Sequence, residues 1–193
     1  MSDDNVLIHA ASRGDASAFR TLVERYKKTV YYIAYDLTGQ HHTAEDLSQD
    51  VFLKMYRGLG TFRGDATLRT WLYRVTVNTY LSQQRKKAFT ALNFFSDHKK
   101  DDCDLTDVIP AEDEHSPEKM AEAVMMQTHI QAALNKLSPR ERTVFTLRHY
   151  QDLSLKEIAD IMDVRIGTVK STLFRAIQRM QKALAFYKLD FNA

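Results

Sequence analysis

The segment Leu153 to Ala176, LSLKEIADIMDVRIGTVKSTLFRA, restricts the possible folds more than any other part of the chain. Ser154 is followed three residues later by Glu157, which is the pattern of a helix capping box, and apolar residues then recur at helical spacing. After a tight turn, a second helix is predicted to begin at Gly167-Thr168 and to present a polar, partly basic face. This layout is typical of a helix-turn-helix that reads duplex DNA.

Charge is distributed unevenly along the chain. Residues 1–96 hold 13 Lys/Arg against 9 Asp/Glu, and residues 119–193 hold 12 against 7. Residues 97–118 hold nine acids and two lysines, together with two prolines. We interpret 97–118 as a flexible acidic linker between two basic domains, because structureless loops of ~20 residues are uncommon within one compact domain. The alternative is a solvated loop inside a single domain.

The composition is that of a globular protein. With 193 residues, of which 44% are hydrophobic, the chain can form one ordinary domain or two small ones. Cys103 is the single cysteine, which excludes an internal disulfide, and no apolar run approaches the ~20 residues of a membrane span. Because the N-terminus is acidic and polar, it does not resemble a signal peptide, and we expect a soluble cytoplasmic protein.

Two amphipathic helices are predicted near the N-terminus. The first runs from Ser17 to a stop at Gly39, and the second begins at Thr43, whose hydroxyl can cap it. One side of the second helix is apolar, at Leu47, Val51, Met55 and Leu59. The opposite side carries an ordered polar face made of Asp46, Gln49, Asp50, Lys54 and Arg57.

The segment from Thr70 to Ala88 fits two structures. Its β-branched run Val75-Thr76-Val77 suits a strand, whereas the spacing of its apolar residues also fits a helix. As a helix it would present a ring, an amide and cations on one side, which suits a nucleic-acid surface. The alternative is a core tryptophan, with basic residues that serve the helix dipole. The residues concerned are Trp71, Arg74, Asn78, Arg85, Lys86 and Lys87.

The C-terminal part carries a second capping box, at Ser138 and Glu141, with proline at the first helical position. The spacing there fits a small helical bundle, and a bundle that binds nothing is the alternative to a DNA reader. Its expected core consists of Val144, Phe145, Leu147, Ile158, Ala159, Met162, Val169, Leu173 and Ile177.

Four blocks of sequence resemble a known family in their order and spacing. They are AFRTLVERY from Ala18, AEDLSQDVFLKMY from Ala44, TFRGDATLRTWLYRVTVNTYL from Thr61, and LSLKEIADIMDVRIGTVKSTLFRA from Leu153. By these blocks the chain resembles bacterial RNA polymerase sigma factors of the extracytoplasmic-function (ECF) type, which form group IV of the sigma-70 family. The resemblance implies an all-α fold of two small helical domains: a region 2-like domain at 1–96 and a region 4-like helix-turn-helix domain at 119–193, joined by the linker at 97–118.

The resemblance also implies what the N-terminal domain does. In the family, the helix matching DLSQDVFLK docks on the β′ coiled coil of core RNA polymerase, which makes Asp46, Gln49, Asp50 and Lys54 candidate polymerase contacts. The following loop and helix open the promoter, capture a flipped base and read the minus-ten element. The candidates for this role are Arg63, Trp71 and Asn78, with Arg74, Arg85 and Lys86 on the DNA backbone.

By the same resemblance, the C-terminal domain reads the minus-thirty-five element as duplex DNA, and its other side binds the β flap. The candidate DNA contacts are Thr168, Lys170, Ser171, Phe174 and Arg175. Relatives often carry proline at the position of Arg165 and arginine at those of Thr172 and Ile177, so this recognition helix is less basic than usual. A promoter sequence is therefore not transferable. An anti-sigma protein is a further partner that the family implies.

Other chemistry is poorly supported by the sequence. His98, Cys103 and His115 share the linker, but their spacing matches no standard zinc arrangement. The chain has no phosphate-binding glycine loop, nucleophile elbow or paired-carboxylate site, so we expect no enzyme, no cofactor and no metal. The rival to a sigma factor is a stand-alone helix-turn-helix regulator, which would bind duplex DNA without polymerase.

Overall fold

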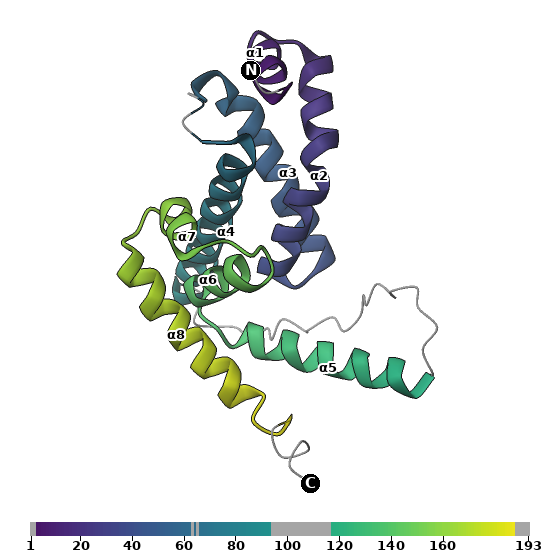
Figure 1. Cartoon of the computed structure of the whole chain (residues 1–193), viewed down its shortest axis with the longest axis vertical. Helices are drawn as coiled ribbons and strands as arrows, with labels where there is room; N and C mark the ends of the chain where they lie inside the picture. Colours follow the sequence, from purple (N-terminus) through teal and green to yellow (C-terminus); the bar gives the residue numbers. More distant parts are fainter. Residues whose placement is uncertain (1–2, 63, 65, 94–116, 188–193) are drawn as a thin grey trace.

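The computed structural model describes residues 3–62, 64, 66–93 and 117–187. This part of the chain is helical and holds no strand, so the predicted all-α class is confirmed (Figure 1). The elements are α1 (Asp3–Ser12), α2 (Ala16–Thr38), α3 (His41–Gly58), the short 3₁₀ turn η1 (Leu59–Thr61), α4 (Leu68–Asn93), α5 (Pro117–Asn135), α6 (Pro139–His149), α7 (Leu155–Met162) and α8 (Ile166–Ala183).

Helices α2 and α3 fold back on each other through a tight turn. Gly39 takes a left-handed conformation with φ 74°, and its N–H donates to Tyr35 O, so the predicted stop is confirmed. The predicted start of α3 is wrong: α3 begins at His41, and its N-cap Gln40 makes no side-chain capping bond. Thr43 cannot cap because it lies inside the first turn, where its hydroxyl donates to Gln40 Oε1 at 3.0 Å.

Helix α4 runs without interruption through the β-branched run that also suited a strand. Thr76 and Thr79 donate their hydroxyl hydrogens to the carbonyls of Leu72 and Val75, at 2.8 and 2.7 Å. The packing of α4 buries both threonines, and these bonds give each hydroxyl hydrogen an acceptor. The helical alternative, which the family resemblance implied, is therefore confirmed.

The C-terminal part contains the predicted helix-turn-helix. Both capping boxes are formed, at Ser138/Glu141 on α6 and at Ser154/Glu157 on α7. Asp163 ends α7 in a left-handed conformation, and α8 then begins at Ile166, one residue earlier than predicted. Five of the nine expected core residues are buried, and the other four are half-buried and line its edge: Phe145, Met162, Leu173 and Ile177.

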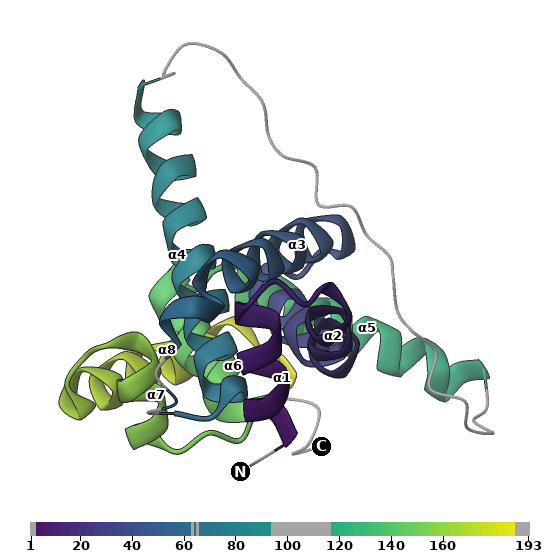
Figure 2. The ribbon, with the colours of Figure 1, turned by 90° about the horizontal axis from the view of Figure 1, so that it is seen from above.

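The N-terminal unit (α1–α4) and the C-terminal unit (α5–α8) pack directly on each other. Val144 and Ile158 belong to the same buried cluster as Leu72 and Val77 of α4. Helices α6 and α7 contact α4, and α6 also contacts α2 (Figures 1 and 2). The C-terminal part of α5 packs on α8, and the rest of α5 extends away from the other helices. Helix α5 begins inside the predicted linker, at Pro117; residues 97–116 of that linker lie outside the described residues.

A buried arginine joins the two units. Arg142 of α6 is 5% exposed, and its Nε and Nη2 donate to the carbonyl of Asp36, near the C-terminus of α2, at 3.2 and 3.1 Å. Its Nη1 donates to Asn135 Oδ1 at 2.7 Å. The Asp36 carboxylate accepts from Gln151 Nε2 at 3.0 Å, and Gln151 Oε1 accepts from the Tyr73 hydroxyl at 3.0 Å. A cation thus lies at the negative end of the α2 dipole, inside a connected polar network.

We predict that Arg142→Leu lowers the free energy of unfolding by about 2–4 kcal/mol, because it removes the donor to the Asp36 carbonyl at the contact between the units. Urea denaturation at neutral pH measures the change. Arg140→Leu is the matched control, since Arg140 lies exposed on the same helix and its loss should stay within about 0.5 kcal/mol. Equal effects of the two substitutions would contradict the role given to Arg142.

Asp36 makes the stability depend on pH. Burial raises the pKa of Asp36 to about 6, although the hydrogen bond from Gln151 and the charge of Arg142 act in the opposite direction. The carboxyl therefore favours the folded state most at pH values below its ordinary pKa of 3.8, and this contribution is lost as the pH rises through about 6.

We predict that Asp36→Asn stabilises the protein near pH 8 by up to about 3 kcal/mol relative to wild type, and that the advantage shrinks towards about pH 4. Asparagine keeps an acceptor for Gln151 but cannot ionise. Denaturation curves of both proteins across this range test the prediction. A stability difference that is independent of pH would show that the carboxyl is not desolvated.

Candidate nucleic-acid interface

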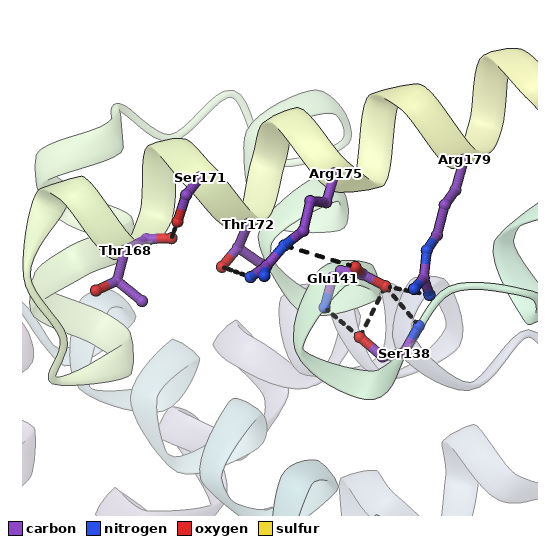
Figure 3. Close-up of polar contacts among 7 residues, drawn as sticks. All are labelled: Ser138, Glu141, Thr168, Ser171, Thr172, Arg175 and Arg179. Atoms are coloured by element: carbon purple, nitrogen blue, oxygen red, sulfur yellow. Dashed lines mark hydrogen bonds and ion pairs between the residues drawn. The ribbon is translucent and has the colours of Figure 1, made fainter.

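The exposed face of α8 gathers the five residues predicted to meet duplex DNA: Thr168, Lys170, Ser171, Phe174 and Arg175. All five are exposed, and Phe174 is 62% accessible. Ser171 donates its hydroxyl hydrogen to the carbonyl of Thr168 at 3.0 Å (Figure 3). The arrangement offers hydroxyls, two cations and a ring along one side of a helix, as base edges and phosphates require.

Arg175 lies back against α6 rather than projecting freely. Its Nε is 4.0 Å from Glu141 Oε1, and its Nη2 donates to Thr172 Oγ1 at 3.4 Å (Figure 3). Arg179, one turn further along α8, donates to Glu141 Oε2 at 2.9 Å. These two contacts were not predicted from the sequence. The i,i+4 spacing indicates that Arg179 lies on the same side of the helix as Arg175, but nothing in the sequence placed Glu141 opposite them.

Glu141 is ionised although it is buried. Burial acts to raise the pKa of Glu141, but hydrogen bonds from Ser138 and the charges of Arg179 and Arg175 outweigh it, so the pKa lies below its ordinary value. The carboxylate accepts from the backbone N–H and the hydroxyl of Ser138, at 3.0 and 2.8 Å. The start of α6 therefore places a fixed negative charge beside α8.

Helix α4 presents part of its predicted DNA face to solvent. Asn78, Arg85 and Lys86 are exposed, and Arg85 Nη2 donates to the hydroxyl of its neighbour Ser82 at 3.2 Å. Arg74 is also exposed but contacts the other unit, because its Nη2 donates to the carbonyl of Asp160 on α7 at 3.0 Å. The predicted residue Arg63 lies outside the described residues.

Trp71 is half-buried and lies at the start of α4. Its ring meets that of Phe62 edge to face, with centroids 5.8 Å apart. It also covers Gly58, where a Cβ atom would approach Trp71 Cζ2 to 3.2 Å. The ring thus packs on the core, as the alternative interpretation of this tryptophan expected, and it also borders the loop between η1 and α4.

The polar face of α3 divides into two parts. All four candidate residues are exposed, but two of them also contact α4: Asp50 Oδ2 accepts from Gln83 Nε2 at 3.0 Å, and Lys54 Nζ donates to Thr79 Oγ1 at 2.9 Å. Asp50 and Lys54 therefore also hold α4 against α3.

A groove between α2 and α3 adjoins this polar face. Gln49 lines it together with Tyr31, Tyr32 and Phe52, and Tyr32 is exposed. These rings were not predicted as part of the site. The consecutive tyrosines did indicate an exposed ring, since on one helix they point in different directions and cannot both lie in the core.

Within the described ranges, no three histidine, cysteine or acidic side chains gather closely enough to hold a metal ion. The linker residues His98, Cys103 and His115 lie outside those ranges. None of the described helices is long and apolar enough to span a bilayer.

Comparison with known families assigns both units. Residues 22–90 match the family described as Sigma-70 region 2, and residues 128–180 match Sigma-70, region 4. The first match covers α3 and most of α2 and α4, and the second covers α6 and α7 and nearly all of α8.

Several curated relatives align along nearly the whole chain. The RNA polymerase sigma-H factor of Pseudomonas aeruginosa is 32% identical over 94% of this chain and 93% of its own length. The ECF RNA polymerase sigma factor SigW of Bacillus subtilis is 31% identical over 92% and 94%. The ECF RNA polymerase sigma-E factor of Escherichia coli is 34% identical over 90% of each chain.

Solved structures share the fold of this chain. The sigma factor RpoE from Bartonella quintana, in complex with the anti-sigma factor NepR, superposes with a TM-score of 0.66 at 25% identity, covering 86% of this chain and 96% of that one. CnrH, in complex with the cytosolic domain of CnrY, shares the fold with a TM-score of 0.61 at 20% identity and full coverage of both chains.

Sigma factors bind core RNA polymerase, direct it to specific promoters and help to open them for transcription initiation. Both conserved regions are matched here in their proper order, and the exposed faces of α4 and α8 lie within them. The protein belongs to the sigma-70 family of RNA polymerase sigma factors, within its extracytoplasmic-function group.

Proposed function

We propose that residues 1–96 bind core RNA polymerase and read the minus-ten element, that residues 119–193 read the minus-thirty-five element, and that residues 97–118 connect them. The main observation behind this division is the exposed polar face of α8. Helix α8 directly follows the turn of a well-formed helix-turn-helix. The separate matches to region 2 and region 4 support the same division.

On the N-terminal unit, α3 supplies the polymerase contact and α4 the minus-ten contact. Asp46 and Gln49 are open to a partner, and Asp50 and Lys54 lie beside them while also bridging to α4. In this proposal they meet the β′ coiled coil, and the C-terminal unit meets the β flap.

A base flipped from the non-template strand would be captured beside Trp71, at the loop that contains Arg63. Arg74, Asn78, Arg85 and Lys86 then follow the DNA along α4. Extruding a base costs a few kcal/mol of stacking, which aromatic and phosphate contacts must offset. The position of Trp71 beside Phe62 and next to this loop supports the assignment.

Reading two elements at once requires the two units to separate. Elements centred near minus ten and minus thirty-five are about 25 base pairs apart, or about 85 Å along B-form DNA. In this structure α7 instead touches α4, through the bond from Arg74 to Asp160, and the units share one core. We infer that the packed arrangement belongs to the free chain, and that polymerase and promoter hold the units apart.

The remaining parts of the proposal concern partners and location. RpoE and CnrH were solved with an anti-sigma factor and with the cytosolic domain of CnrY, respectively. We propose an anti-sigma protein as a partner of this chain too. The protein would act in the cytoplasm, where core polymerase works, and would catalyse no reaction itself.

Runoff transcription with purified core polymerase and a genomic promoter library tests the whole proposal. We expect initiation that depends on this protein, at start sites that share an upstream and a downstream element. A stand-alone regulator would instead bind duplex DNA by itself and would need another sigma factor to initiate. Failure to initiate on any library promoter would exclude the proposal.

We predict that Asp50→Arg weakens binding to core polymerase by at least about tenfold, because it reverses a charge on the docking face. A pull-down titration with core polymerase measures it. Since Asp50 also accepts from Gln83, Gln83→Ala is the matched control: it removes that bond and keeps the carboxylate. If both variants lose the same affinity, Asp50 acts through α4 and not through polymerase.

We predict that Arg175→Ala weakens binding of the holoenzyme to the upstream element by roughly 1–3 kcal/mol and relaxes the preference at one base position. Competition between promoters that differ only at single upstream positions measures this effect. A uniform loss on all sequences would instead assign Arg175 to a phosphate.

A further inference from the structure

Glu141 is a buried anion whose ionic partners come from the recognition helix α8. It is 5% exposed, and its Oε2 accepts from the N–H and hydroxyl of Ser138 and from Arg179 Nη1. Arg175 Nε lies 4.0 Å from its Oε1 (Figure 3). A buried carboxylate requires hydrogen bonds and positive charge around it, so the position of Glu141 and those of the two guanidinium groups depend on each other.

A second capping box in the same chain shows that capping does not require these arginines. At the start of α7, Glu157 Oε2 accepts from the N–H of Ser154 at 2.8 Å, and Glu157 N–H donates to Ser154 Oγ at 3.2 Å. Glu157 is exposed, and it forms no ion pair within the part of the chain that the structure describes. The capping hydrogen bonds by themselves therefore do not require arginines, and at Glu141 the ion pairs act on a carboxylate that is buried as well as capping.

Both arginines remain accessible while Glu141 holds them. The side chains of Arg175 and Arg179 are 60% and 55% exposed. They lie beside the exposed face of α8, and Arg175 lines, with Thr168 and Glu141, a cleft between α8 and α6. Ion pairs this exposed are weak, so a phosphate or a base edge competes for the same guanidinium groups. The hydrogen bonds from Ser138 hold Glu141 in place, so its carboxylate stays behind when the arginines turn to DNA.

We propose that Glu141 is a positioning residue for promoter recognition, which restrains Arg175 and Arg179 so that α8 discriminates between upstream sequences. The inference rests on the proposed function, in which α8 reads the minus-thirty-five element. A free arginine pairs readily with any phosphate, and such contacts carry no sequence information. An arginine held in one orientation pairs well only where a base edge or phosphate lies at the matching place.

The test uses Glu141→Gln in the full chain, reconstituted with core polymerase. Glutamine at this helix position preserves the capping box but removes the charge. Holoenzymes are selected on a promoter library with a randomised upstream element, at low and moderate salt. The retention ratio is the fraction of DNA bound with the best upstream sequences divided by the fraction bound with average sequences. We expect Glu141→Gln to lower this ratio roughly two- to fivefold, the range that partly exposed ion pairs support. Retention on average sequences should rise at low salt and fall more steeply with added salt, because the released arginines neutralise phosphates.

Two controls separate positioning from capping. Ser154→Ala removes the capping hydroxyl of the box at the start of α7, which does not touch Glu141, so it should lower the melting temperature and leave the retention ratio unchanged. Glu157→Gln alters the matched box that has no arginines, and it should change neither the ratio nor the salt dependence. Thermal unfolding of every variant shows that each is folded at the assay temperature.

The possible results are distinguishable. If Glu141→Gln matches wild type in ratio and salt dependence, or loses retention equally on all sequences as a destabilised cap would, the inference is overturned. If the wild-type holoenzyme itself enriches no upstream sequence, the proposed function of α8 fails, and the inference fails with it.

Discussion

The packing of the two units depends on one buried cation. Arg142 leaves α6 and donates to the carbonyl of Asp36, close to the C-terminus of α2, where helix carbonyls lack intrahelical partners. Because the guanidinium is 5% exposed, it would be costly there without these acceptors and Asn135. A second link between the units runs from the Asp36 carboxylate through Gln151 to the Tyr73 hydroxyl. Around these bonds the apolar side chains of α4, α6 and α7 close into one core.

If the two units separate on a promoter, as we propose, the polar network between them affects the free energy of that step. Gln151, Asp36 and Tyr73 are polar groups that water can satisfy once they are exposed, so opening costs less than exposing an apolar core of the same size. The carboxyl of Asp36 adds to this effect near neutral pH, because it is buried with a pKa of about 6 and regains its hydration when α6 withdraws. The polar network thus lowers the free energy needed to separate the units, although separation also exposes the apolar core that they share.

Local signals allowed most helices and the helix-turn-helix to be predicted, because caps and apolar spacing are properties of neighbouring residues. Ser138, Ser154 and Gly39 act as the sequence indicated. Thr43 did not, since a threonine near a helix start cannot show by itself which turn it will occupy. The contacts between units were not predictable: Arg142 and Asp36 are 106 residues apart, and nothing local pairs them. The exposed faces of α3, α4 and α8 were predictable because they follow from the spacing of residues within one helix. Glu141 was predicted only as a cap, because its arginine partners lie on another helix.

The recognition helix shows how a weakly basic surface can serve a sigma factor. Thr172 occupies a position where relatives often carry arginine, and here it is buried and accepts from Arg175. Glu141 neutralises part of the remaining charge, so α8 by itself should bind duplex DNA poorly. A domain tethered to polymerase, however, meets its element at a high effective concentration and does not need a strong attraction to phosphates. Under those conditions extra cations would add mainly binding to wrong sequences, and the restraint that we propose for Arg175 and Arg179 would cost little affinity while it preserved discrimination.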